Sequence, residues 1–241
     1  MKKNNPIQSL WVGPELSNME IMCINSYLAH GHDFYLYTYC DIPNVPSGAI
    51  IKDANSIIPE KDIYLDNYNS YAHFADLFRF TMLYKAGGWW VDTDSVCLKP
   101  FDFRDDFVFS SELTNDCKRH YRINNGYMKS KSGAKFLKEC LDFLSARGHE
   151  YIHWGELGIT LLSRMVFRNN LERYIKPPEY FCPVSYYHVD QLINDTTYSL
   201  PENSYALHWW NELWRRQGID KNAKFSESCL YEIMKAKYLN L

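Results

Sequence analysis

The stretch from Tyr71 to Pro100 constrains the fold of this chain more than any other part of it. Residues 71–86 contain neither Gly nor Pro, and their apolar side chains recur at helical spacing, which predicts an amphipathic helix. Gly87 and Gly88 predict the end of this helix, because glycine adopts positive φ freely. The run Trp89-Trp90-Val91 then predicts a short buried strand.

Charged residues mark both parts of this stretch. Asp92 and Asp94 follow the predicted strand, and we expect both carboxylates to point at one place, because alternate residues of a strand face the same way. Asp76 and Arg79 are three apart and therefore lie on one face of the predicted helix. A charge in an apolar helix costs free energy unless it is satisfied, so these two form either a structural ion pair or a ligand-binding pair. A bare D-x-D alone is often a solvated turn.

Taken in order, these features resemble the D-x-D sugar-binding region of family 32 glycosyltransferases and the related glucosyltransferase domains of large clostridial toxins. The resemblance implies that Asp76 and Arg79 contact the sugar and phosphate of a nucleotide-sugar donor and belong to the catalytic site. It also implies that Asp92, Thr93 and Asp94 hold the donor, with Asp94 acting chiefly through a divalent metal ion.

The rest of the chain predicts an α/β fold. Strands and helices alternate in its first half, which suggests βαβ units and a largely parallel sheet. The strands are expected at residues 7–12, 33–39, 49–51 and 107–110, and the helices at 18–29, 134–147, 157–167 and 226–238. With the resemblance, this predicts a GT-A-like single domain over residues 1–241, a Rossmann-like α/β/α sandwich. We expect residues 1–100 to bind the nucleotide sugar, and residues 101–241 to form the acceptor side and a C-terminal helix.

Four aromatic residues are candidates for donor binding. Trp11 and Tyr39 fall at the ends of the first two predicted strands, where ligands collect in open α/β sheets. The family has a Trp against the nucleotide at the first of these positions, although an ordinary core aromatic also fits Trp11. Near the C-terminus the family has a His-x-Trp…Trp segment, and the resemblance implies that Trp210 and Trp214 cap the donor.

The same C-terminal segment supplies the remaining metal ligand. His208 matches the first His of the family segment, so the resemblance implies a metal site made of Asp92, Asp94 and His208, which would hold Mn2+ or Mg2+. Trp209 replaces the second His of the family. Glu212 is therefore a reserve candidate for the third ligand.

Two further segments are candidates on the sugar side. Asn124, Asn125 and Gly126 resemble a family position at which Asn faces the sugar or acceptor, and its amide can both donate and accept. An ordinary Asn-Gly turn fits these residues equally well. Glu156 stands where a helix is predicted to begin, and a carboxylate is favourable there in itself. It is also a candidate catalytic residue, facing the anomeric carbon.

Composition limits the functions open to the chain. The net charge of −3 gives no general basic field for nucleic acid. The seven cysteines are odd in number and lack a C-x-x-C motif, which favours reduced thiols in a cytoplasmic protein. No apolar run approaches the roughly 20 residues of a membrane span, and no signal peptide is evident. We expect at most peripheral contact with the inner face of a membrane.

The resulting prediction is a metal-dependent, retaining glycosyltransferase. It would move a hexose-type sugar from a nucleotide sugar, with UDP favoured, to a glycan or lipid-linked glycan. By analogy alone, the product is a bacterial surface polysaccharide such as capsule or lipopolysaccharide. Two alternatives stay open: a haloacid-dehalogenase-like phosphatase, because the segment 92–96 fits its D-x-D-x-V motif, and a non-catalytic sugar-binding module.

Overall fold

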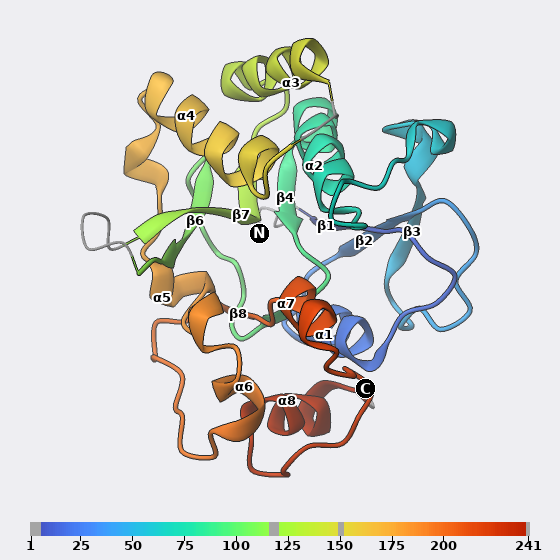
Figure 1. Ribbon diagram of the computed structural model, residues 1–241, viewed down its shortest axis with the longest axis vertical. Coiled ribbons are helices and arrows are strands. Elements are labelled where there is room, and N and C mark those ends of the chain that lie inside the picture. Colours follow the sequence, from blue (N-terminus) through green and yellow to red (C-terminus); the bar gives the residue numbers. More distant parts are fainter. Residues whose placement is uncertain (1–5, 116–120, 149–151, 240–241) are drawn as a thin grey trace.

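The computed structural model describes residues 6–115, 121–148 and 152–239 (Figure 1). Its centre is a six-stranded sheet in the order β3-β2-β1-β4-β7-β6. Neighbours are parallel from β3 to β4 and antiparallel from β4 to β6. The strands are β1 (Ile7–Trp11), β2 (Phe34–Thr38), β3 (Ile50–Asp53), β4 (Gly88–Val91), β6 (Val108–Leu113) and β7 (Tyr121–Ser130). The predicted α/β class with a mostly parallel sheet is confirmed.

Helices cover both faces of this sheet (Figure 1). One layer consists of α2 (Ala72–Ala86), α3 (Lys135–Arg147) and α4 (Leu161–Arg168). The other side carries α1 (Asn18–Ala29), α5 (Pro178–Phe181), α6 (Gln191–Asn194), α7 (Asn211–Gln217) and α8 (Leu230–Tyr238). A small antiparallel pair, β5 (Ser95–Cys97) with β8 (Ala206–His208), joins the C-terminal segment to the end of β4. The C-terminal half of the chain thereby reaches the acidic turn after β4.

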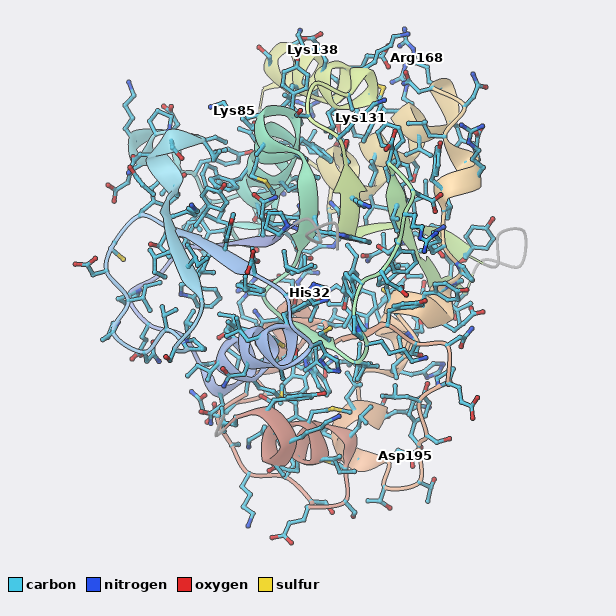
Figure 2. All side chains as sticks on the ribbon, turned by 180° about the vertical axis from the view of Figure 1, so that it is seen from behind. His32, Lys85, Lys131, Lys138, Arg168 and Asp195 are labelled. Atoms are coloured by element: carbon cyan, nitrogen blue, oxygen red, sulfur yellow. The ribbon has the colours of Figure 1, made fainter. Side chains whose placement is uncertain are left out.

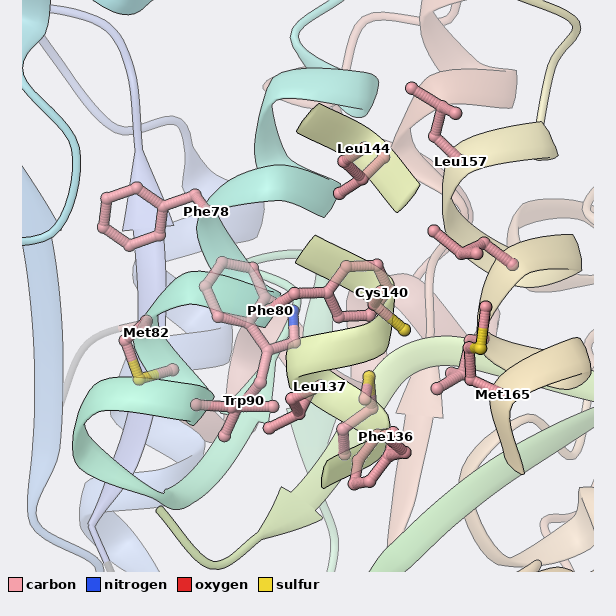
Figure 3. Packing of buried hydrophobic residues seen from close by; sticks show 14 of the residues in the cluster. Phe78, Phe80, Met82, Trp90, Phe136, Leu137, Cys140, Leu144, Leu157 and Met165 are labelled. Atoms are coloured by element: carbon pink, nitrogen blue, oxygen red, sulfur yellow. The ribbon is translucent and has the colours of Figure 1, made fainter. Parts of the chain in front are cut away.

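The two tryptophans of β4 explain how the sheet is held between the layers. Successive strand residues face opposite sides, so Trp90 packs with Phe78 under α2 (Figure 3), whereas Trp89 packs on Phe101 with ring centroids 4.9 Å apart. Both indoles are 2% exposed. Their large buried area anchors β4 from both faces, and this anchoring fixes the place at which β4 ends.

The glycine pair before β4 behaves as predicted. Gly87 has a φ of 67° and ends α2, donating its backbone N–H to Leu83. A Cβ at Gly87 would lie 2.7 Å from the backbone nitrogen of Ser132. Glycine is thus required here both for positive φ and for close approach of the chain.

Other elements differ from the predictions at their ends. The helix predicted over residues 157–167 begins instead with a π-helical turn, Glu156–Thr160, which leads into α4. The last helix starts at Leu230 rather than at residue 226. The alternative of an Asn-Gly turn at residues 124–126 is wrong, because these residues lie inside the long strand β7, where Asn124 pairs with Ser110 of β6 and Asn125 and Gly126 fall in a register shift.

The surface of the α2–α3–α4 layer carries basic side chains, among them Lys138 and Arg168 on the outer helices (Figure 2). Lys85 lies in the last turn of α2, where a cation complements the helix dipole.

Six cysteines of the described residues have free thiols. Within the described ranges no helix combines the length and apolar character that a membrane crossing requires.

Candidate active site

The carboxyl end of β4 lies at a reversal of the strand order. The chain runs outward from β1 to β2 and β3, and then returns to β4 on the other side of β1. Ligands bind at such switch points in open α/β sheets. Here a pocket of about 390 Å³ opens, a volume within the range of small-molecule sites. Of the predicted site residues, the pocket is lined by Asp76, Arg79, Asp92, Asp94, Asn124, Asn125, His208, Trp210 and Glu212.

Asp92 and Asp94 converge through a turn. Strand β4 ends at Val91, so the expected strand alternation does not apply to them. The turn is held by the backbone N–H of Asp92, which donates to the Gly126 carbonyl at 2.9 Å. His208 comes from β8 and places Nε2 3.2 Å from Asp94 Oδ1 and 3.9 Å from Asp92 Oδ2. One ligand atom from each of these three residues lies within 4.8 Å of the others, as a shared cation requires.

The charges of Asp94 and His208 depend on each other. Burial alone would raise the pKa of Asp94, but His208 and the backbone N–H of Asn211, 2.7 Å from Oδ2, hold that pKa below its usual value. Burial would likewise lower the pKa of His208, and the two aspartates raise it instead. His208 Nδ1 is buried and unbonded among the described residues, so Nε2 is the nitrogen that faces the carboxylates.

The three side chains fit a divalent ion. Two carboxylate oxygens and one imidazole nitrogen form a donor set suited to Mn2+, while Mg2+ prefers oxygen alone. The reserve ligand Glu212 lines the pocket but is engaged elsewhere, because its Oε1 accepts from Arg215 and Arg216 at 2.7 Å each. The geometry therefore favours His208 over Glu212 as the third ligand.

Arg79 links the acidic turn to the rest of the pocket. Its Nη2 lies 3.2 Å from Asp92 Oδ1, and its Nη1 donates to the Asn125 carbonyl at 2.6 Å. Its Nε is 3.5 Å from Asp76 Oδ1, and the guanidinium lies over the Trp90 ring, 5.0 Å from the ring centroid. The two readings of the Asp76–Arg79 pair are compatible, since the ion pair exists and both side chains also line the pocket.

Asp76 is a deeply buried carboxylate of the pocket, with 6% of its surface exposed. Burial raises its pKa to about 6, although Arg79 and the Asn125 amide, which donates to Oδ1 at 2.6 Å, oppose this shift. The π-helical turn brings Gly158 against the same carboxylate. A Cβ there would lie 2.5 Å from Asn125 Nδ2 and 2.7 Å from Asp76 Oδ1. No other residue fits at position 158 without displacing Asp76.

The β6–β7 hairpin supplies a part of the wall that the sequence did not reveal. Glu112 and Arg122 are opposite each other in register, and Arg122 Nε lies 2.5 Å from Glu112 Oε1. Asn124 donates to Glu112 Oε2 at 2.5 Å and accepts from the Gly126 N–H at 2.7 Å. A Cβ on Gly126 would lie 3.0 Å from Asp92 Oδ2. The Asn-Asn-Gly segment therefore shapes the pocket beside the acidic turn.

Trp210 is the one predicted capping residue that lines the pocket. Its φ of 60° is left-handed, which is uncommon and strained for a bulky side chain. The indole packs on the His208 imidazole, with centroids 4.1 Å apart and the planes tilted by 33°, and donates from Nε1 to the Val184 carbonyl at 3.0 Å. This conformation fixes the His208 imidazole from one side.

Six predicted site residues lie outside the pocket lining, and one of them is Gly126, described above. Trp214 is 1% exposed and packs on Tyr231 in the C-terminal core. Trp11 donates from Nε1 to the Glu15 carbonyl, and Tyr39 donates to the Ile58 carbonyl. Thr93 lies within the acidic turn without lining the pocket, and Glu156 is described next. Their functional roles stay predictions.

Glu156 is bonded at the start of the π-helical turn. Its Oε2 accepts from the His153 backbone N–H at 3.0 Å, and Oε1 lies 3.3 Å from Arg147 Nε. These contacts hold its pKa below the usual value. The carboxylate thus acts as a helix-start residue in this structure, and it does not line the pocket.

Further lining residues escaped prediction. Those with charged, polar or aromatic side chains are His73, Glu112, Arg122, Trp154, Tyr186 and Arg216. His73 could have been found, because it lies three residues before Asp76 and therefore on the same face of α2. Glu112 and Arg122 lie on β6 and β7, Arg216 lies on α7, and the sequence does not display how these distant segments meet.

Comparisons with known proteins agree with this geometry. Residues 17–114 match the family model described as the glycosyltransferase sugar-binding region containing a DXD motif. This segment includes α2, β4 and the acidic turn. The structure titled PaToxG Glycosyltransferase is similar in fold, with a TM-score of 0.51 and 16% sequence identity over 69% of each chain.

Two curated relatives extend the match. The lactosylceramide 4-alpha-galactosyltransferases of Mus musculus and Rattus norvegicus are 28% and 26% identical to this chain over 154 and 155 residues. The matches cover 57% of this chain and 40% of each relative, so the chain spans well under half of these relatives' length.

The fold is GT-A-like, and the region that lines the acidic end of the pocket matches a segment found in glycosyltransferases. More particularly, residues 17–114 resemble the DXD-containing sugar-binding region of glycosyltransferases, and the predicted resemblance to family 32 is confirmed.

Proposed function

We propose that this chain moves a hexose-type sugar from a nucleotide sugar, with UDP favoured, to a glycan or lipid-linked glycan acceptor, and that the reaction requires Mn2+ or Mg2+. One observation carries the proposal. Asp76, Arg79, Asp92, Asp94 and His208, which come from a helix, a turn and a distant strand, all line one pocket at the switch point of the sheet. A site for a cation, a diphosphate and a sugar needs these groups together.

The metal-binding end of the pocket would hold the diphosphate. Asp92, Asp94 and His208 are the residues that would hold the ion, and the mixed donor set favours Mn2+ over Mg2+. When bound, the ion neutralises the negative charge of the diphosphate leaving group. Arg79, whose Nη2 lies beside Asp92, adds a fixed positive charge and a planar fork suited to phosphate oxygens.

The next part of the pocket would hold the sugar ring. Asp76 is ionised above about pH 6 and can accept hydrogen bonds from sugar hydroxyls as charge develops at the anomeric carbon. Asn125 and Gly158 hold its carboxylate in place. This positioning matters because small displacements of a reacting group are costly for catalysis.

We propose retention by displacement on one face of the sugar. The anomeric C–O bond to the diphosphate breaks, the acceptor oxygen forms the new bond on the same face, and the hydroxyl proton passes to the departing phosphate. Glu156 supports this choice, since its carboxylate is bonded to Arg147 and to the His153 N–H rather than directed into the pocket. A trapped glycosyl adduct on Glu156 would overturn it.

The test measures nucleotide release from UDP-galactose, UDP-glucose and GDP-mannose with Mn2+, with and without a β-lactoside acceptor. Asp94→Asn removes one ligand charge and should lower turnover by at least about 100-fold, while the thermal transition is preserved. The matched control is Asp195→Asn, which alters a half-buried aspartate remote from the pocket (Figure 2) and should leave turnover unchanged.

The outcomes separate the alternatives. Release of phosphate from phosphoesters, without nucleotide release, would favour the phosphatase. Binding of UDP with Mn2+ but no turnover of any donor would favour the sugar-binding module. The names of the relatives make galactose the first donor sugar and a lactose-terminated glycolipid the first acceptor to try. A role in capsule or lipopolysaccharide synthesis stays a prediction.

A further inference from the structure

His73 is a buried histidine that the donor site does not use. It lines the pocket and is 1% exposed, yet neither ring nitrogen has a hydrogen-bond partner among the residues that the structure describes. Buried polar atoms in native proteins normally have partners. An unsatisfied imidazole facing a pocket therefore indicates that its partner arrives with a ligand.

Asp66 orients this imidazole. Its Oδ1 accepts from the backbone N–H groups of Tyr68 at 2.9 Å and Ser70 at 3.0 Å, so the carboxylate cannot turn. Its other oxygen, Oδ2, lies 3.6 Å from His73 Nδ1 and has no hydrogen bond of its own among the described residues. A carboxylate on this side favours the tautomer with the proton on Nδ1. Nε2 is then left as an acceptor.

The charge state agrees with this geometry. Burial lowers the pKa of His73, although Asp66 opposes the shift. The ring is therefore neutral at neutral pH and offers a lone pair rather than a second N–H. A neutral imidazole with its Nδ1 proton beside a carboxylate suits a hydroxyl donor better than a phosphate.

The position of His73 along α2 indicates which substrate supplies this hydroxyl. Arg79 contacts the acidic turn, and Asp76 contacts Arg79. His73 lies three residues before Asp76, which is about 4.5 Å further along the axis of α2 and away from the acidic turn. With the diphosphate beside Asp92 and the sugar at Asp76, His73 lies beyond the sugar. This end of the pocket is the one left for the second substrate.

The surroundings of His73 suit a glycan. The Trp154 ring is 40% exposed, and its centroid is 6.2 Å from that of His73. Tyr68 meets Trp154 edge-on at 5.5 Å, and the Arg216 guanidinium lies 4.1 Å from the Trp154 centroid. Aromatic surface beside a hydroxyl acceptor matches the apolar C–H face and the hydroxyl groups of a sugar.

We propose that His73 Nε2 accepts a hydrogen bond from a hydroxyl of the glycan acceptor, in a subsite completed by Trp154 and Tyr68, with Asp66 as the positioning residue. This inference rests on the proposed function, because it takes the donor sugar to occupy the Asp76 side. The acceptor class it implies is a neutral, hydroxyl-rich glycan.

The test uses the full chain and separates acceptor from donor. Binding of methyl β-lactoside, methyl β-galactoside and methyl β-glucoside is measured by saturation-transfer NMR with UDP and Mg2+ present. Acceptor-free hydrolysis of UDP-galactose with Mn2+, UDP affinity and thermal stability are measured in parallel. The variants are His73→Ala, His73→Gln and Asp66→Asn, and the control is His188→Gln, which alters an exposed histidine outside the pocket.

We expect at least one glycoside to bind the unmodified chain, and His73→Ala to weaken that binding by about tenfold or more. His73→Gln, whose amide retains an acceptor, should recover part of it, and Asp66→Asn should weaken it less than His73→Ala. Acceptor-free hydrolysis, UDP affinity and stability should stay within about threefold or a few degrees in all variants.

Three results would overturn the inference. They are failure of every glycoside to bind, equal binding by His73→Ala and the unmodified chain, and loss of hydrolysis in step with glycoside binding, which would place His73 at the donor or in the structural core. If the unmodified chain hydrolyses no nucleotide sugar, the proposed function fails instead, and glycoside binding still reports on the subsite.

Discussion

Replacing Gly158 by alanine tests whether the π-helical turn positions the sugar-side carboxylate. The added Cβ would lie 2.5 Å from Asn125 Nδ2 and 2.7 Å from Asp76 Oδ1. Both distances are well inside van der Waals contact, so the carboxylate and the amide must move by roughly 1 Å. A displacement of that size at a reacting group lowers turnover by about 100-fold. We therefore expect a loss of about that size in kcat for nucleotide-sugar hydrolysis.

The same substitution should leave the metal end of the pocket intact, because Asp92, Asp94 and His208 are not among the atoms nearest to the added Cβ. Affinity for UDP with Mn2+ should change by less than about threefold. Overpacking of a dense interior costs about 1–3 kcal/mol, which is roughly 2–12 °C in Tm for a domain of this size. Alanine favours a helix by about 1 kcal/mol over glycine, so any loss of stability arises from the overlap.

Steady-state hydrolysis, isothermal titration with UDP and Mn2+, and thermal unfolding measure the three quantities. Thr160→Ala is the matched control, because it adds no atom and alters an exposed side chain of the same turn. Turnover of the Gly158 variant within about threefold of the unmodified chain would refute the argument. So would loss of nucleotide affinity equal to the loss of turnover.

Two further substitutions address the pocket from other sides. The folded-state pKa of Asp76 is raised to about 6, so ionisation of Asp76 favours the unfolded chain between about pH 4 and pH 6. Asp76→Asn removes this effect, and the variant should gain up to about 3 kcal/mol of stability over the unmodified protein as pH rises through this window. Chemical denaturation at several pH values checks this, and a pH-independent difference would contradict it; turnover should be lost. Gly126→Ala would place a Cβ 3.0 Å from Asp92 Oδ2 and 3.2 Å from His208 Cε1. Affinity for Mn2+, followed by electron paramagnetic resonance of the free ion, should fall by about tenfold or more. An unchanged affinity would contradict this expectation, because the acidic turn would then move aside without loss of metal binding.

The sequence predicted the core of the site because its signals are local there. Helix, glycine stop, aromatic strand and acidic turn follow one another within a single stretch, and each depends on neighbouring residues. The structure shows Asp76 and Arg79 on one face of α2 and the carboxylates just after β4. The reasoning from strand alternation was nevertheless wrong for Asp92 and Asp94. The buried residues Trp89, Trp90 and Val91 complete β4, and the chain turns immediately after Val91, before the two aspartates.

The remaining parts of the site depend on contacts between distant segments. Glu112 and Arg122 meet through the register of β6 and β7, and a β-bulge shifts that register between Phe109 and Ser110. No local pattern displays such a shift. Trp214 was predicted to cap the donor but lies outside the pocket. It lies only four residues after Trp210, but α7 turns it into the C-terminal core.

The charges around the pocket support the proposed pairing of a cation and a diphosphate in it. Arg79 forms ion pairs with both Asp76 and Asp92, and Arg122 forms an ion pair with Glu112. These guanidinium charges are largely compensated, so they cannot by themselves balance a diphosphate in a partly desolvated site. The acidic turn, conversely, holds two carboxylates. Arg79, shared with Asp76, offsets Asp92 only in part, and His208 faces both carboxylates with the nitrogen that a metal ion would take. A divalent cation and a diphosphate therefore compensate each other's charge, and each favours binding of the other.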